Sequence, residues 1–176
     1  VARDQPPAQA LHDFLRSYPG RVLVAADSAG RREALLEVLD PAGLRPAVMA
    51  LYRFARSADD VADEGDAPPI ARLARLHDYQ LALEACAHGH PVHDPSLAPL
   101  FERLGRAIAA HGLPLQPFRD LLDAFMQDVG KTRYRDFDEL RDYCRRSADP
   151  VGRLMLHLYG AATAENLKRS DAICTS

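Results

Sequence analysis

The feature that most constrains this chain is a succession of helical patterns that begins near residue 45 and continues almost to residue 176. Apolar side chains recur there at three- and four-residue intervals, and no strand-like stretch interrupts them. Short breakers that contain proline or glycine divide the run. The pattern predicts helices over residues 45–64, 69–88, 96–111, 115–129, 137–148, 151–161 and 164–174.

The first forty residues follow a different pattern. Residues 21–26 are short, apolar and valine-rich, as expected of a buried strand, and residues 31–39 have the pattern of a helix. A lone strand cannot complete a sheet, so this βα segment lacks partner strands. The sequence therefore predicts a mainly α protein preceded by a short βα segment, with domains over residues 1–43 and 44–176.

Bulk composition narrows the classes of function. The net charge of -3 gives no electrostatic basis for binding nucleic acid, and none is expected for residues 44–176. No apolar run is long enough to span a bilayer. The three cysteines are odd in number and widely spaced, which fits reduced thiols better than a disulfide framework. We therefore expect a cytoplasmic protein.

One face of the helix predicted over residues 45–64 carries Tyr52, Arg56, Asp59 and Asp63. Steps of four, three and four residues keep these side chains on one face. Carboxylates one turn apart can share divalent cations, and Mg²⁺ prefers carboxylate and phosphate oxygens. An arginine one turn earlier can donate charge-assisted hydrogen bonds to a diphosphate. A solvated acidic surface explains the same residues, so spacing alone leaves both interpretations open.

Longer segments carry a resemblance to a known family. Residues 51–66 (LYRFARSADDVADEGD) resemble the first aspartate-rich motif of the squalene/phytoene synthase family. Residues 143–152 (YCRRSADPVG) resemble a second block of that family, and residues 118–134 (FRDLLDAFMQDVGKTRY) match it in character. The resemblance covers roughly residues 44–176, and the sequence of these motifs is most similar to the hydroxysqualene synthase branch of bacterial hopanoid biosynthesis.

This resemblance implies part of an all-α isoprenoid-synthase fold around a deep apolar cavity, with Mg²⁺ and a diphosphate at its mouth. It implies that Asp59 and Asp63 are Mg²⁺ ligands. Tyr52 and Arg56 would contact the diphosphate of the substrate, and Arg56 would thereby take part in catalysis. Tyr143 would lie near the reacting carbocation, where an aromatic face or a hydroxyl can stabilise positive charge.

The same resemblance implies that Ala148, Val151 and Gly152 line the prenyl cavity, where small residues leave room for a long isoprenoid chain. Without the resemblance, ordinary helix packing explains these three residues equally well. Tyr143 alone would also be a core residue more often than a catalytic one.

The implied activity is that of a Mg²⁺-dependent transferase or lyase acting on presqualene or farnesyl diphosphate. In the hydroxysqualene synthase branch, presqualene diphosphate ionises and water captures the cation. Such an apolar substrate is compatible with peripheral association with a membrane. The family also uses a second aspartate-rich helix, expected shortly after the last residue of this sequence. We therefore expect the chain to be C-terminally truncated and to lack synthase activity by itself.

The N-terminal segment has a resemblance of its own. Residues 8–43, and most clearly residues 11–39, resemble a fragment of bacterial transcription-repair coupling factor. No phosphate-binding G-x-x-x-x-G-K-[ST] motif is present, so ATP binding is not implied. This resemblance supports an alternative function, a non-enzymatic fragment that interacts with protein or DNA. Binding by such a fragment would depend on residues 11–39 and not on the aspartates.

Two further interpretations remain open. His88, His90 and His93 form the run HGHPVH, which could bind Zn²⁺. The rigid proline and the turn-like context instead favour a solvated loop between helices. The other interpretation is a helical bundle that carries neither of the activities described above.

Overall fold

The computed structural model describes residues 44–131 and 133–175. The chain separates into two units, Val1–Arg45 and Pro46–Ser176. The described residues belong to the second unit, except Leu44 and Arg45, which precede it. The βα segment predicted for residues 1–43 lies outside the described residues.

All of the regular structure in the described residues is helical, which confirms the prediction of a mainly α fold there. The helices are α3 (Arg45–Asp63), α4 (Pro69–Ala87), α5 (Ala98–His111), α6 (Gln116–Asp128), α7 (Phe137–Ser147), α8 (Asp149–Leu158) and α9 (Ala164–Cys174). All but α8 begin and end within about two residues of the predicted limits, as expected for strongly periodic segments.

The helix predicted over residues 151–161 was placed too late in the chain. Helix α8 begins at Asp149, because Pro150 occupies its first turn, where a backbone N–H would have no helical partner. It ends at Leu158, before Gly160 adopts a left-handed conformation with φ 64°. Only Ala148 therefore separates α7 from α8, and Asp149–Pro150, which lies between two of the predicted helices, is the start of a helix.

Helix α3 buries one face along its whole length. Its buried residues are Ala47, Ala50, Leu51, Phe54, Ala58 and Ala62. This spacing of three and four residues gives a continuous apolar stripe. The Phe54 ring contacts Phe101 of α5 and Phe118 of α6 edge to face, with centroid distances of 5.8 and 5.5 Å. Residues far apart in sequence thus meet in one aromatic core.

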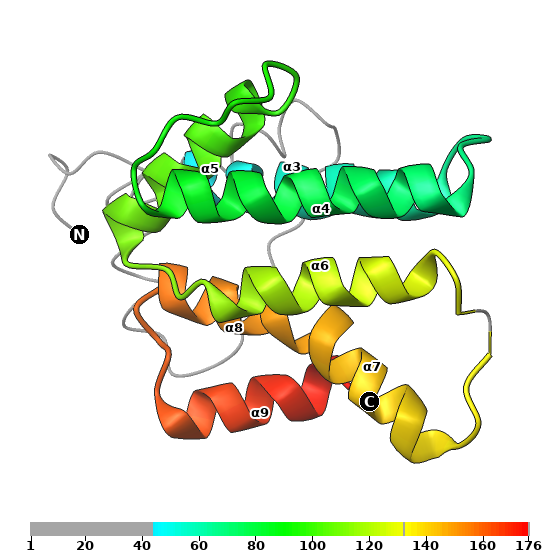
Figure 1. The fold of residues 1–176 in the computed structure, drawn as a ribbon. Helices are drawn as coiled ribbons and strands as arrows, with labels where there is room; N and C mark the ends of the chain where they lie inside the picture. The colour runs from blue at the N-terminus through cyan, green and yellow to red at the C-terminus, as the bar shows by residue number, and fades with distance from the viewer. Residues whose placement is uncertain (1–43, 132, 176) are drawn as a thin grey trace, which may run out of the picture. The chain divides into compact units, whose positions relative to one another are not determined.

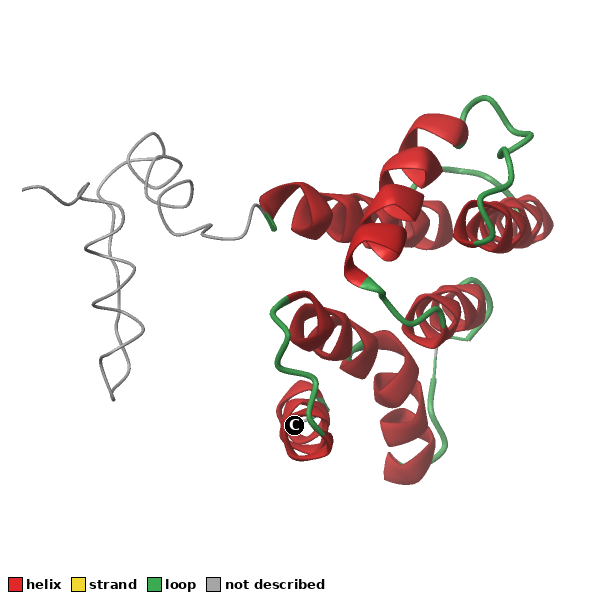
Figure 2. Ribbon diagram, turned by 90° about the vertical axis from the view of Figure 1, so that its left-hand side faces the viewer, coloured by secondary structure: helices red, strands yellow, loops and turns green. Residues whose placement is uncertain are grey.

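The helices pack in a sequence of neighbouring pairs (Figures 1 and 2). Helix α4 packs against α5 and α6, α6 packs against α7 and α8, and α8 packs against α7 and α9. In Figure 1, α4 runs in front of α3, α6 lies below α4, and α9 lies at the lower edge. None of the described helices is both long enough and apolar enough to cross a membrane.

Candidate active site

An apolar pocket lies between α3, α6 and α8. Its volume is about 490 Å³. Nearly all of the side chains that line it are apolar, and the polar exceptions, Tyr52, Arg56 and Asp59, come from α3. Its walls are formed by Val48, Leu51, Tyr52, Phe54, Ala55, Arg56, Asp59, Phe118, Leu121, Phe125, Val151, Leu154 and Met155.

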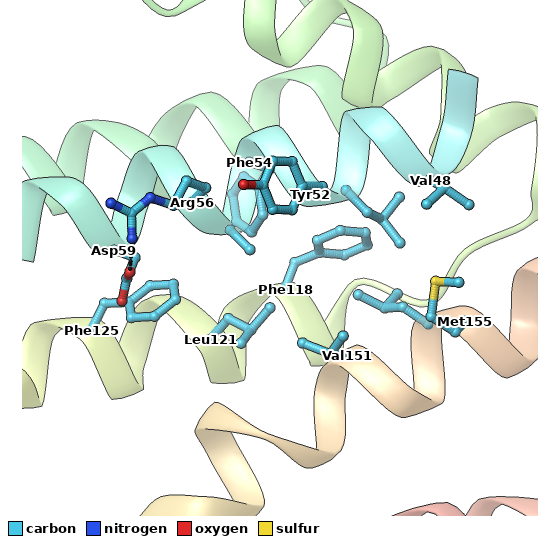
Figure 3. A pocket seen from close by; sticks show the side chains of 13 residues that line it. Val48, Tyr52, Phe54, Arg56, Asp59, Phe118, Leu121, Phe125, Val151 and Met155 are labelled. Atoms are coloured by element: carbon cyan, nitrogen blue, oxygen red, sulfur yellow. Dashed lines mark hydrogen bonds and ion pairs between the residues drawn. The ribbon is translucent and has the colours of Figure 1, made fainter. Parts of the chain in front are cut away.

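The charged side chains lie at one end of this pocket. Figure 3 shows Arg56 and Asp59 together beside Phe125, while Val48 and Met155 lie at the opposite end. Tyr52 lies between the two ends and is 60% exposed. The pocket therefore offers a long apolar surface that ends in a polar, ionic group. A ligand with an apolar chain and a charged head has matching chemistry.

Arg56 is surrounded by carboxylates from its own helix and the following turn. Its guanidinium contacts Asp59 at 3.1 Å, Asp60 at 2.7 Å and Glu64 at 2.6 Å. These negative charges, above all that of Asp60, raise the pKa of Arg56. All of these side chains are partly exposed. The guanidinium thus holds several carboxylates near the pocket mouth and stays accessible to solvent.

Three carboxylates from two helices influence one another beside the pocket. Burial raises the pKa of Asp59, and the charge of Asp63 raises it further. Burial likewise raises the pKa of Asp128 on α6, and the charges of Asp63 and Asp59 add to this effect. Mutual repulsion of this kind favours a bound cation. Asp63 itself is exposed and does not line the pocket.

Asp128 is a candidate that the sequence interpretation missed. Its Oδ2 accepts a 2.7 Å hydrogen bond from the hydroxyl of Tyr143 on α7. Burial and this bond raise the pKa of Tyr143. Tyr143 does not line the apolar pocket, and it reaches the acidic group through Asp128. The only sequence signal was the position of Asp128 within residues 118–134, which matched the family in character.

The three small residues expected to line a cavity lie in different surroundings. Val151 lines the pocket and is 48% exposed. Ala148 lies between α7 and α8 and does not belong to the pocket wall. Gly152 faces α9, since a Cβ atom there would lie 2.2 Å from Ser170 Oγ and 2.9 Å from Cys174 Sγ. Close packing of α8 on α9 accounts for this glycine.

The histidine run does not form a metal site. The rings of His88 and His90 stack with centroids 6.3 Å apart, and His88 Nδ1 lies 2.8 Å from the carbonyl oxygen of Glu84. Within residues 44–131 and 133–175, no three or more His, Cys, Asp or Glu side chains are arranged to hold a metal by themselves. Phosphate oxygens or water would have to complete the coordination of any cation at the aspartates.

Comparison with known proteins places the chain in a family. The family profile described as squalene/phytoene synthase matches residues 29–176. A hydroxysqualene synthase from Rhodopseudomonas palustris is 41% identical over 130 residues, which is 74% of this chain and 41% of the relative. A hydroxysqualene synthase from Zymomonas mobilis is 42% identical over 135 residues, which is 75% of this chain and 42% of the relative.

A solved structure has a similar fold. The crystal structure of squalene synthase HpnC from Alicyclobacillus acidocaldarius is 36% identical and superposes with a TM-score of 0.69. The match covers 82% of this chain and 52% of that chain. The helical arrangement of the described residues is therefore similar to part of that fold.

The chain belongs to the squalene/phytoene synthase family. It spans about two fifths of the length of the curated relatives it matches. The family match begins at residue 29, within the segment that resembles transcription-repair coupling factor. That second resemblance gains no support from these comparisons, and neither does the function it implied.

Proposed function

We propose that this chain forms the diphosphate end and part of the prenyl cavity of an enzyme that processes prenyl diphosphates. The observation that carries the proposal is the apolar pocket that ends at Arg56 and Asp59. Its apolar length suits an isoprenoid chain, and its ionic end suits a diphosphate. Membership of the family and the names of the relatives support the same assignment.

The acidic end has the chemistry that Mg²⁺ requires. All candidate donors are carboxylate oxygens, and Asp59 and Asp63 lie one turn apart on α3. Mg²⁺ in phosphate sites usually takes one or two carboxylates, with phosphate oxygens and water completing the octahedron. A bound cation would relieve the repulsion that raises the pKa of Asp59. When bound, Mg²⁺ would neutralise the charge of the leaving diphosphate.

The residues of this chain then have distinct roles. Arg56, which already contacts Asp59, can also donate to a diphosphate oxygen at the pocket mouth. Tyr52 is exposed beside it and can donate its hydroxyl to the same group. Tyr143 directs its proton at Asp128, and its oxygen or ring could stabilise a carbocation that forms beside it.

The reaction that fits the relatives is the conversion of presqualene diphosphate to hydroxysqualene. The carbon–oxygen bond to diphosphate breaks, and the diphosphate leaves with the electron pair. A water oxygen then bonds to the cation and loses a proton. No reductant is consumed. The pocket walls of Phe118, Leu121 and Leu154 would exclude bulk water from the prenyl chain.

Calorimetric titration of the chain with inorganic pyrophosphate, with and without Mg²⁺, tests the diphosphate end. We expect binding that needs Mg²⁺ and that weakens roughly tenfold or more in Asp59→Asn and Asp63→Asn, since each removes a charged ligand. Pyrophosphate binding that is indifferent to Mg²⁺ and to both substitutions would overturn the proposal.

A farnesyl thiodiphosphate titration tests the apolar wall. Val151→Asp places a charge on the wall, so it should weaken binding of the farnesyl analogue and leave pyrophosphate binding unchanged. Ile70→Asp is the matched control, because Ile70 on α4 is 79% exposed and lies outside the pocket. Equal effects of the two substitutions on binding of the farnesyl analogue would show that its farnesyl group does not bind in this pocket.

A further inference from the structure

Arg72 on α4 binds the end of α3 through three backbone carbonyls. Its guanidinium donates to the carbonyl oxygens of Ala62, of Gly65 at 2.5 Å and of Ala67 at 2.9 Å. The side chain is half-buried. Among the residues that the structure describes, no carboxylate forms an ion pair with Arg72. Its hydrogen bonds to described residues therefore go to the backbone around the end of α3.

Of these three carbonyls, that of Ala62 lies in the last turn of α3, and those of Gly65 and Ala67 lie in the loop that follows the helix. The last four carbonyls of a helix have no N–H partner within the helix. The last turn is closed by the Glu64 N–H, which donates to the Asp60 carbonyl at 2.9 Å, and the chain then reverses at Gly65 with φ 81°. A planar guanidinium can satisfy several such oxygens at once, which a lysine ammonium does less well.

The end of α3 is otherwise a place where a helix should fray. Asp59, Asp60, Asp63 and Glu64 concentrate negative charge near the negative end of the helix dipole. Helix α3 has no basic residue in its last turn to offset this charge. Terminal turns open first under such conditions. Arg56, earlier on α3, pairs with Asp59, Asp60 and Glu64, and Arg72 from the neighbouring helix adds a second cation at the carbonyl end of α3.

We propose that Arg72 is a positioning residue, which holds the last turns of α3 helical so that Asp59 and Asp63 stay one turn apart. Its consequence for ligand binding rests on the proposed function of those aspartates. Without Arg72, the diphosphate and its cation would have to order the turn as they bind. Part of the binding free energy would then be spent on that ordering, and affinity would fall.

Hydrogen exchange tests the structural half of the inference. In Arg72→Gln, amides of residues 60–67 should exchange faster by roughly tenfold, the factor expected for one lost charge-assisted hydrogen bond. Exchange rates in Arg72→Lys should lie between those of Arg72→Gln and those of the unchanged chain. Arg103→Gln is the control, because Arg103 is an exposed arginine on α5 whose side chain forms no hydrogen bond or ion pair in the described part of the chain. Equal exchange rates in Arg72→Gln and Arg103→Gln would show that Arg72 does not hold the last turns of α3.

Titration of the same variants with pyrophosphate and Mg²⁺ tests the functional half. We expect Arg72→Gln to weaken binding several-fold, Arg72→Lys to recover part of the loss, and Arg103→Gln to bind like the unchanged chain. Faster exchange with unchanged affinity would show that Arg72 is structural only, which would overturn the positioning role. If the unchanged chain binds no pyrophosphate, the proposed function fails, while the exchange measurement still decides whether Arg72 holds the turn.

Discussion

Helices α3 to α6 and the pair α7 and α9 bury their side chains to very different extents. Each of the first four contributes several buried apolar residues to one core, whereas α7 and α9 contain no buried residue. Polar contacts hold that pair in place. Tyr143 donates to Asp128, Arg153 pairs with Asp171 at 2.8 and 2.6 Å, and Thr175 donates to Asp149.

The difference shows how the candidate site is built. Packing fixes the walls that α3 and α6 give to the pocket, since close-packed side chains tolerate little displacement. Directional bonds fix α7, and α7 brings Tyr143 to the acidic end. A hydrogen bond within the protein replaces hydrogen bonds to water, and an exposed ion pair is screened by solvent, so each such contact contributes little net stability. Tyr143 therefore lies on the part of the molecule that is easier to displace.

The largest effect should come from the core of α3 to α6. Phe54 is fully buried between Phe101 and Phe118, so Phe54→Ala removes a ring from the centre of the packing. We expect a loss of about 3 to 5 kcal/mol in the free energy of unfolding, measured by urea denaturation. Phe137→Ala is the counterpart on α7, where the ring is 71% exposed, and it should change stability by less than about 0.5 kcal/mol. Similar losses in both variants would refute the contrast.

An intermediate effect should come from the contact between α8 and α9. In Gly152→Ala the new methyl would overlap Ser170 Oγ, so the serine must rotate or α9 must move. Overpacking of this kind costs about 1 to 3 kcal/mol. We also expect Cys174 to react faster with a thiol reagent in this variant, because its Sγ lies against the new methyl as well.

Gly130→Ala provides the matched control for that substitution. A methyl group at Gly130 meets nothing within 4 Å, and this glycine does not have a positive φ. Stability and Cys174 reactivity should therefore stay at the values of the unchanged chain. If Gly152→Ala behaves like Gly130→Ala, the packing of α9 is looser than the structure indicates.

The contrast also separates what the sequence could predict from what it could not. The apolar stripe of α3, with Leu51, Phe54 and Ala58 at helical spacing, is a local pattern and predicts both the helix and its buried face. The capping residues of α7 were only half predictable. The spacing of Asp136 and Glu139 is that of a capping box. Asp136 accepts from the Glu139 N–H, but the Glu139 side chain accepts from the Arg135 N–H instead of closing a reciprocal box.

The site residues divide in the same way. Tyr52, Arg56 and Asp59 share one helix, so their spacing alone brought them to the same pocket. Asp128 and Tyr143 lie on different helices, and their contact depends on how α6 crosses α7, which no local pattern encodes. Periodicity also places Val151 and Gly152 on neighbouring faces without saying which face meets the pocket and which meets α9.

The smallest effect should be a difference in pH dependence between the two parts. On α7, the Arg135 N–H and then Lys131 lower the pKa of Glu139 to about 2 from an ordinary value of 4.5. A depressed carboxyl pKa means that the folded chain favours the ionised form. Glu139 therefore contributes stability above pH 4.5, and this contribution is lost as the pH falls toward about 2. Glu139→Gln should lower the melting temperature slightly at neutral pH, and the difference should vanish through that window.

Asp59 on α3 should behave in the opposite way in metal-free buffer. Burial, and then the charge of Asp63, raise its pKa, so the folded chain binds the proton more tightly than the unfolded chain does. Ionised Asp59 therefore costs stability above its pKa, and Asp59→Asn should raise the melting temperature at neutral pH and lose this advantage in acid. The same substitution should weaken pyrophosphate binding. If Asp59→Asn and Glu139→Gln change the melting temperature in the same direction at neutral pH, the acidic end of the pocket is not the electrostatically strained site that its carboxylates indicate.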